Sequence, residues 1–355
     1  MKGDAMEDPC LPNWEGNPVR VIQIHPTLEC NLRCRHCYSS SGPGFKGSQL
    51  AVGDLVRFLE YARGYGFETL SVSGGEPFMY RELDELLGES HQLKNRNMVA
   101  SNGMLLKSAR ARKIIRDLDL VAISVDGDES IHDAIRNQIG AFQKMKEGVQ
   151  VLREEGSYFG FIHTITERSW EKFIELAEFA HSMGARLLQM HPLEQTGRAV
   201  LDPGLLSPSQ ECLHKVFILA SYLRQKYSGV LHIQLDFLHR EHILDSPVLV
   251  SAAQEATDLT EDNFPEIVRC LVVDANGSIF PMSYGFDDYF CLGNIADLKK
   301  GTNVIDRFIA KKGAAFCSLI HGVFQAIAVN DENDMIPWTE IIVRESHEFQ
   351  KACSA

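Results

Sequence analysis

The cysteines Cys30, Cys34 and Cys37 follow the short apolar run Val21 to Ile24 in the spacing Cx3Cx2C. Thiolate sulfur is a standard ligand of zinc ions and of iron–sulfur clusters. Three thiolates are one too few to close a tetrahedral zinc site or to ligate every iron of a four-iron cluster. The spacing therefore predicts a metal centre with one position open to another ligand, in a loop that follows a buried strand.

The 355-residue chain carries a formal net charge of −13 and nine cysteines, an odd number at irregular spacing. An acidic chain lacks the clustered positive field that nucleic acids and anionic membranes bind, so we expect neither as a partner. The sequence contains no run of 18 apolar residues, so it predicts no transmembrane helix. The polar residues 1–16 lack the apolar segment of a signal peptide. We therefore expect a cytoplasmic protein, in which thiols stay reduced and available to metal.

Short apolar runs alternate with amphipathic segments from residue 21 onward. The runs are nearly continuous in apolar residues, as in parallel strands buried on both faces. The six expected strands are Val21–Ile24, Thr69–Ser73, Asn97–Ser101, Leu120–Val125, Tyr158–Thr164 and Ala185–Met190. Because βα crossovers are right-handed, six such repeats predict an α/β fold, a partial (β/α)6 barrel with its helices outside. Beyond them we expect a helix that starts at Ser207 and Pro208 and a strand over Val230–Phe237.

From Cys270 to Met282 the pattern becomes that of a β-hairpin. Two apolar runs flank Asn276-Gly277, residues that tolerate the positive φ of a tight turn. The chain is therefore expected to have three parts. These are an N-terminal extension over residues 1–18, the barrel over residues 19–240 and a small C-terminal α+β module over residues 241–355.

Chemistry in a barrel of this kind collects at the carboxyl ends of the strands. Each expected strand ends in polar or turn residues that would face one side of the barrel. Paired glycines let the backbone approach a ligand closely, and a glutamate beside them can accept hydrogen bonds from an ammonium group. After the cysteine loop, the candidate residues at these strand ends are Gly74, Gly75, Glu76, Ser101, Asn102, Ser124, Asp126, Met190 and His191.

The cysteine loop, with the sequence CNLRCRHCY, and the motif GGEP at residues 74–77 together resemble the radical S-adenosylmethionine (SAM) superfamily. The resemblance implies that Cys30, Cys34 and Cys37 hold one [4Fe-4S] cluster and that SAM binds its open iron. It also implies that SAM is cleaved reductively to methionine and a 5′-deoxyadenosyl radical, which abstracts hydrogen from a substrate C–H bond. The SAM contacts that it implies are His36, Tyr38, Met190 and His191 near the adenine, Gly74, Gly75 and Glu76 at the methionyl amine, Ser101 and Asn102 at the carboxylate or ribose, and Ser124 and Asp126 at the ribose or the substrate.

Further motifs resemble the SPASM or twitch subgroup of that superfamily, which includes peptide maturases. They are Ser124-Val125-Asp126-Gly127 with Arg136 downstream, Gly197-Arg198-Ala199, and the hairpin from Cys270. In SPASM proteins a cysteine ligand follows the hairpin glycine at the place where this chain has Met282. A thioether is a poor substitute for a thiolate at an iron–sulfur cluster. We therefore expect a C-terminal extension that keeps a SPASM-like or twitch-like fold without auxiliary clusters.

The resemblance favours an enzyme that modifies a peptide, by a crosslink or an epimerisation, with electrons from a low-potential donor such as flavodoxin or ferredoxin. Arg136 and Cys291 are its candidate catalytic residues. A second interpretation is a dehydrogenase or epimerase of a small molecule such as a sugar or aminocyclitol. The cysteines by themselves also fit a zinc knuckle completed by His25 or His36, or a non-catalytic metal-binding scaffold that recruits a partner.

Overall fold

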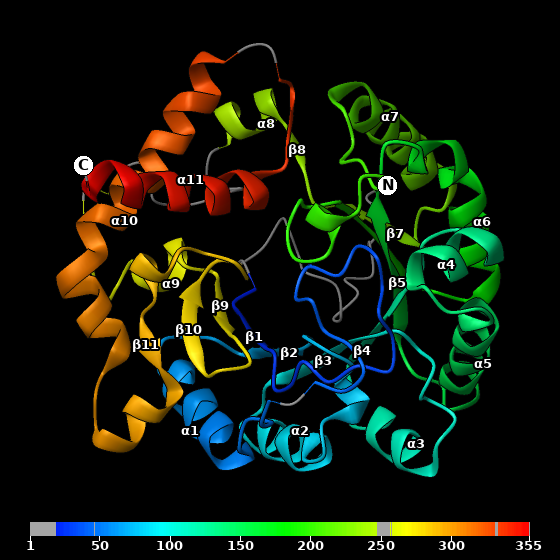
Figure 1. The fold of residues 1–355 in the computed structure, drawn as a ribbon, viewed down its shortest axis with the longest axis horizontal. Coiled ribbons are helices and arrows are strands. Elements are labelled where there is room, and N and C mark those ends of the chain that lie inside the picture. The colour runs from blue at the N-terminus through cyan, green and yellow to red at the C-terminus, as the bar shows by residue number, and fades with distance from the viewer. Residues whose placement is uncertain (1–18, 46, 247–255, 257, 331–332, 355) are drawn as a thin grey trace, which may run out of the picture.

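The computed structural model describes residues 19–45, 47–246, 256, 258–330 and 333–354, so the expected extension over residues 1–18 lies outside the described residues. Within them, ten strands form one curved sheet in the order β11-β10-β9-β1-β2-β3-β4-β5-β6-β7, with helices around its outer side (Figure 1). The barrel strands are β1 (Val21–Ile24), β2 (Thr69–Val72), β3 (Arg96–Ser101), β4 (Leu120–Ser124), β5 (Phe159–Ile165), β6 (Leu187–Pro192) and β7 (His232–Leu235). The helices between them are α1 (Val52–Arg63), α2 (Leu83–Gln92), α3 (Ala109–Ile115), α4 (Glu129–Arg136), α5 (Ala141–Glu154), α6 (Phe173–Met183) and α7 (Gln210–Lys226).

Strands β1 to β7 all pair in parallel, as their apolar sequences predict. The sheet does not close on itself, because β7 and β11 are its two edges. The predicted α/β class and the partial barrel are therefore confirmed. The strand expected over Val230–Phe237 is β7.

Helix α7 begins later than the sequence predicts. Its N-cap is Ser209, whose hydroxyl accepts a hydrogen bond from Cys212 N–H at 3.2 Å. The Ser207 hydroxyl instead donates to Leu193 O at 2.9 Å. Ser207 therefore fixes the loop to the end of β6 and does not cap the helix.

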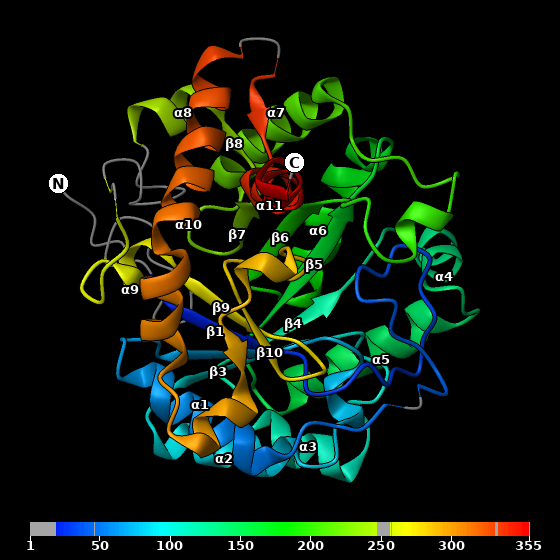
Figure 2. The same cartoon turned by 60° about the vertical axis from the view of Figure 1, so that its left-hand side comes forward.

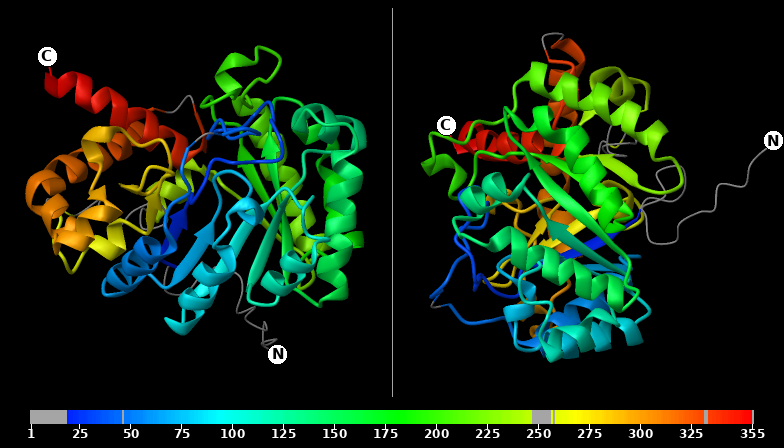
Figure 3. Two further views of the ribbon diagram at one scale, coloured as in Figure 1. Left: turned by 60° about the horizontal axis from the view of Figure 1, so that its bottom comes forward. Right: turned by 90° about the vertical axis from the view of Figure 1, so that its right-hand side faces the viewer.

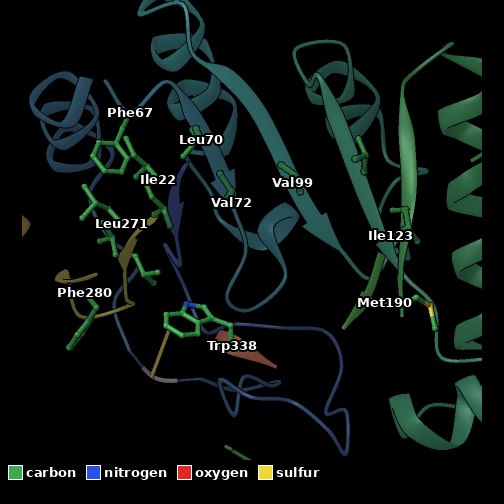
Figure 4. Packing of buried hydrophobic residues seen from close by; sticks show 14 of the residues in the cluster. Ile22, Phe67, Leu70, Val72, Val99, Ile123, Met190, Leu271, Phe280 and Trp338 are labelled. Atoms are coloured by element: carbon green, nitrogen blue, oxygen red, sulfur yellow. The ribbon is translucent and has the colours of Figure 1, made fainter. Parts of the chain in front are cut away.

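Alternation along each strand separates the hydrophobic core from the barrel interior. Ile22 and Ile24 of β1 are fully buried, whereas Gln23 between them lines the cavity inside the barrel. Helix α1 packs Leu55 and Phe58 into the same core, and each such side chain contributes roughly 1.5–3 kcal/mol. Figure 4 shows Ile22, Leu70, Val72 and Val99 from successive strands in this core.

The C-terminal strands extend the barrel sheet. Strand β9 (Cys270–Val273) pairs in parallel with β1, β10 (Ser278–Pro281) forms the predicted hairpin with β9, and β11 (Gly293–Asn294) follows on its far side. The hairpin turn places Gly277 at φ +86°, a conformation that glycine adopts without strain. Because hydrogen bonds continue from β1 into β9, the boundary between residues 240 and 241 stays a prediction.

The remaining C-terminal elements lie between the two edges of the sheet and on one side of the barrel (Figures 1 and 3). They are β8 (Leu238–His239), α8 (Arg240–Asp245), α9 (Phe264–Ile267), α10 (Val304–Val329), β12 (Met335–Ile336) and α11 (Trp338–Ser354). Strand β12 pairs antiparallel with β8, which follows β7 directly. This pairing starts α11 beside the last barrel strand, and Thr339 in its first turn lines the cavity.

Helix α10 is long and apolar enough, by length and composition, to cross a membrane. In this fold 44% of its most apolar window is buried inside the protein. Phe308 and Phe316 of α10 belong to the main hydrophobic core, and Figure 2 shows α10 beside α11, which is seen end-on. The helix thus packs one part of its surface into the hydrophobic core.

Candidate active site

One cavity of about 460 Å³ lies at the carboxyl ends of the barrel strands, and Cys30, Cys34 and Cys37 line one wall of it. Their loop folds back on itself, because Cys30 N–H donates to Gly42 O at 3.3 Å. Nine of the residues predicted to contact SAM line the same cavity. They are His36, Tyr38, Gly74, Gly75, Glu76, Ser101, Asn102, Ser124 and His191.

Each cysteine sulfur has a hydrogen-bond partner in the surrounding protein. The partners are Leu32 N–H for Cys30 at 3.4 Å, Arg136 Nη1 for Cys34 at 3.7 Å and Ser39 Oγ for Cys37 at 3.4 Å. Hydrogen bonds to sulfur stabilise and tune iron–sulfur clusters. Burial raises the pKa of Cys30 to about 12, so metal binding at this site would release a proton.

The three thiols suit an iron–sulfur cluster better than a single ion. Among the described residues, no group of three or more His, Cys, Asp or Glu side chains is arranged to hold one metal ion. A four-iron cluster takes each thiolate on a different iron, so its ligands need not meet at a point. A zinc knuckle would also need a histidine beside the three thiols, and within the part of the chain that the structure describes no such group is arranged to hold one ion.

Glu76 is a buried carboxylate beside the cysteine wall, with 1% of its surface exposed. Ser101 Oγ donates to its Oε1 at 2.8 Å, and Asn102 N–H donates to its Oε2 at 2.9 Å. Burial raises the pKa of Glu76, and these hydrogen bonds oppose the shift. A cation in the cavity would stabilise the ionised form, so the site suits an ammonium group.

Asp126 lies behind the cysteine wall and does not line the cavity. Its oxygens accept hydrogen bonds from Arg136 Nε at 2.5 Å and Arg136 Nη2 at 3.2 Å, besides the bond with His36. Although burial raises the pKa of Asp126, the Arg136 guanidinium and the interaction with His36 hold it well below its usual range. The Asp126 carboxylate is thus bonded within the protein, and its contact with the ribose or the substrate stays a prediction. Asp126 positions Arg136, which reaches Cys34.

The loop after β6 holds the cysteine loop from the other side. Arg198 N–H donates to Cys37 O at 3.0 Å, and Arg198 Nε donates to Cys34 O at 2.8 Å. Gly197 adopts φ +57°, and a Cβ there would lie 2.2 Å from Tyr38 O. Only glycine permits this contact. Gly197 and Arg198 together hold the cysteine loop in place, and we name this pair of contacts the clamp.

Met190 does not line the cavity. It is fully buried in the hydrophobic core (Figure 4), whereas its neighbours Gln189 and His191 line the cavity. Successive side chains of a strand point to opposite faces, so the side chains of Met190 and His191 lie on opposite faces of β6. The contacts of both residues with SAM stay predictions.

Cys291 does not line the cavity, and its catalytic role stays a prediction. Its thiol donates to Gly293 O at 3.4 Å, next to β11. Met282 does line the cavity, together with Tyr284. The chain therefore presents a thioether and a phenol on the side where the SPASM resemblance places a further metal ligand.

Several further residues line the cavity that no sequence motif predicted. They are Gln23, Ser71, Thr164, Gln189, Glu194, Asp236, Tyr284 and Thr339. Gln23, Ser71 and Gln189 are polar residues inside apolar strands, which is a usable signal for the inner face of a barrel. Asp236 and Thr339 have no such signal.

Residues 24–180 match the Radical SAM superfamily. The chain is 29% identical over 203 residues to the pre-heme d1 synthase of Dinoroseobacter shibae, which covers 57% of this chain and 50% of that protein. It is 29% identical over 184 residues to the AdoMet-dependent heme synthase of Methanosarcina barkeri, and this match covers 51% of this chain and 53% of that protein. It is 23% identical over 218 residues to the PqqA peptide cyclase of Granulibacter bethesdensis, and this match covers 61% of this chain and 58% of that protein. The chain spans about half the length of the curated relatives it matches.

Among solved structures, SuiB of Streptococcus suis bound to S-adenosylmethionine superposes with a TM-score of 0.62 at 17% identity, covering 84% of this chain and 67% of SuiB. The enzyme anSMEcpe with bound AdoMet superposes with a TM-score of 0.60 at 16% identity, and the superposition covers 94% of this chain and 97% of anSMEcpe. At these identities the likeness establishes the fold alone. Residues 24–180 are therefore a domain of the radical SAM superfamily. This superfamily uses a [4Fe-4S] cluster and SAM as cofactors.

Proposed function

We propose that this chain is a radical SAM enzyme that holds one [4Fe-4S] cluster on Cys30, Cys34 and Cys37 and acts on a peptide. The observation that carries the proposal is that these cysteines share one cavity with Glu76, in a domain that matches the superfamily. When bound, the cluster and SAM supply reductive cleavage of a C–S bond and a 5′-deoxyadenosyl radical that removes hydrogen from a substrate C–H bond.

The protein's own residues position and shield these groups. Glu76, held by Ser101 and Asn102, accepts hydrogen bonds from the methionyl amine. The apolar side chains Leu32 and Leu193 line the cavity and limit the access of water. Electrons come from a low-potential donor such as flavodoxin or ferredoxin, which we place with the enzyme in the cytoplasm.

A peptide substrate is supported by several proteins of this fold. The relatives include PqqA peptide cyclase and AlbA, described as an antilisterial bacteriocin subtilosin biosynthesis protein. SuiB has been solved with a precursor peptide, and anSMEcpe with AdoMet and a peptide. The reaction that this proposal favours is a crosslink or an epimerisation of a peptide side chain.

The heme synthases among the relatives, at 29% identity, support a second candidate, a tetrapyrrole substrate. The charge of the cavity argues against it. Glu76, Glu194 and Asp236 line the cavity with only two arginines, Arg136 and Arg198, and Arg136 is paired with Asp126. Tetrapyrrole precursors of heme carry several carboxylates, which need unpaired cations.

Anaerobic reconstitution with iron and sulfide tests the proposed function. Wild type should bind about four iron atoms per monomer, as one cubane cluster requires, and form 5′-deoxyadenosine from SAM and dithionite. Cys34→Ala should lose both the iron and the product. Cys212→Ala removes a buried thiol of α7 away from the cavity and should keep both. Equal product from Cys34→Ala and wild type would falsify the proposal, and about eight irons would reveal an auxiliary cluster.

The substrate is tested by mass spectrometry under the same conditions. Candidate precursor peptides and iron-coproporphyrin III are each supplied with SAM and reductant. We expect a mass shift on a peptide. A shift on the tetrapyrrole alone would establish the second candidate.

A further inference from the structure

The part of the cavity wall at the ends of β6 and β7, which we name the opposite wall, carries a series of hydrogen-bonded side chains from three elements. Asp236, after β7, accepts hydrogen bonds from Gln189 Nε2 at 2.6 Å and from Gln234 Nε2 at 2.9 Å. It also contacts His191 Nδ1 at 3.2 Å. These three partners fix the Asp236 carboxylate, so it is a support for His191 and is not free to bind a ligand.

His191 has a carboxylate at each ring nitrogen. Asp236 lies at Nδ1, and Glu194 Oε1 lies 3.4 Å from Nε2. A carboxylate can only accept, so both ring nitrogens must carry a proton and the ring is an imidazolium. Burial lowers the pKa of His191, but the two carboxylates outweigh it and raise the pKa to about 10. His191 is therefore a cation at neutral pH and holds Glu194 in place.

Glu194 is the last residue in this series of hydrogen-bonded side chains. Among the described residues, His191 is its one side-chain partner, and the carboxylate lines the cavity. Two carboxylates, Asp236 and Glu194, face one imidazolium, so these three side chains together carry a net charge of −1. Arg198 also lines the cavity, but it lies against the cysteine loop, where its Nε donates to Cys34 O, and no ion pair joins it to Glu194 among the described residues. A negative charge inside a cavity is stabilised when a cation joins it.

The first turn of α11 approaches the same region. Burial raises the pKa of Glu340, and the charge of Glu194 raises it further, although Glu340 itself does not line the cavity. Thr339 beside it lines the cavity and supplies a hydroxyl. An anionic group entering here would meet carboxylates from two elements, whereas an ammonium group would meet acceptors.

We infer that Glu194, held by His191, Asp236 and Gln189, is a subsite for an ammonium group of the substrate. The inference rests on the proposed function, because it places the substrate in the cavity that the cysteines line. Two kinds of substrate present this chemistry: a peptide with a lysine-type side chain and an amino sugar or aminocyclitol. Carboxylate-rich tetrapyrroles do not present it.

Binding of matched probes tests the inference on the reconstituted full-length enzyme with saturating SAM. The first pair is acetyl-Ala-Lys-Ala-amide and its norleucine analogue, and the second is glucosamine and glucose. Binding is measured by saturation-transfer NMR titration. In at least one pair, the amine should bind about tenfold more tightly than its neutral partner, the effect of one charge-assisted contact. The pair that shows the preference identifies the kind of substrate.

Variants then assign the preference to Glu194. Glu194→Gln should reduce it to about twofold or less, and Glu194→Asp, which keeps the charge, should retain part of it. Glu211→Gln, on the exposed face of α7, should leave it unchanged. Urea titration of each variant checks that it is folded.

Three outcomes would overturn the inference: no preference in either pair, a preference that survives in Glu194→Gln, or one that SAM abolishes. The last outcome would place Glu194 in the SAM site. Formation of 5′-deoxyadenosine by wild type is measured on the same preparation. A wild type that forms the product without an ammonium preference refutes the subsite alone, whereas a preference without product refutes the proposed function.

Discussion

The two walls of the cavity differ in how the chain builds them. The cysteine wall comes from contiguous motifs, with Cys30, Cys34 and Cys37 on one loop and Glu76 on the next. The opposite wall combines His191, Asp236 and Thr339 from three elements that are far apart in the sequence. The cofactor side is thus encoded in short motifs, whereas the side that we assign to the substrate is assembled by the fold.

The walls also differ in burial. Behind the cysteines, the Asp126 side chain is fully buried and the Arg136 side chain is 9% exposed. On the opposite wall, the His191 side chain is 37% exposed and Asp236 is 20% exposed. Substitutions in the cysteine wall should therefore mainly change stability and cofactor binding. Substitutions in the opposite wall should mainly change ligand binding and the dependence of stability on pH.

The largest effect is expected from Asp126→Asn, which leaves Arg136 buried without its counter-charge. Removal of one partner from a buried ion pair costs about 3–5 kcal/mol. Urea unfolding should show a loss of that size. Asp202→Asn removes the carboxylate that pairs with Arg35 near the surface and should change stability little. Equal losses in the two variants would contradict the contrast between buried and exposed pairs.

Gly197→Ala tests the clamp on the cysteine loop, since its Cβ would lie 2.2 Å from Tyr38 O. The matched control is Gly184→Ala at the end of α6, where φ is +82° and nothing lies within 4 Å. Both should lose about 1–2 kcal/mol from the left-handed backbone, and Gly197→Ala should lose roughly 1–3 kcal/mol more from the clash. It should also bind less iron after reconstitution. Identical behaviour of the two variants would exclude the clamp.

Glu76→Gln should weaken SAM binding about tenfold, because the amide cannot offer a charge to the methionyl amine. The measurement is calorimetric titration of the reconstituted enzyme with SAM. Glu211→Gln serves again as the control on the exposed face of α7. An unchanged affinity in Glu76→Gln would remove Glu76 from the SAM site.

The smallest effect is expected from pH at the opposite wall. The pKa of His191 is raised to about 10 in the folded protein, above its ordinary value of 6.5. Its contribution to stability is therefore complete below about pH 6.5 and is lost as pH rises toward 10. Urea midpoints from pH 7 to 10 should fall more steeply for wild type than for His191→Gln. Parallel curves would show that His191 is not an imidazolium held by Glu194 and Asp236.

The sequence alone determined the cofactor side of this protein. The three cysteines lie within eight residues, so their spacing places them on one loop whatever the rest of the chain does. The apolar runs of β1 to β6 also predicted a parallel sheet, because strands buried on both faces need apolar residues at nearly every position. Carboxyl ends of parallel strands share one edge, which is why Glu76, Ser101 and Ser124 lie in the same cavity as the cysteines.

Only the tertiary structure decided which strand-end residues face the cavity. The phase of alternation in β6 puts Met190 in the core and His191 in the cavity, and a short apolar run does not reveal that phase. Asp126 lies behind the wall because Arg136, ten positions later on α4, reaches back to it. The contact between His191 and Asp236 joins residues 45 positions apart, and pairing of β12 with β8 starts α11 beside the cavity. Such contacts depend on how separate elements pack, so no local pattern in the sequence contains them.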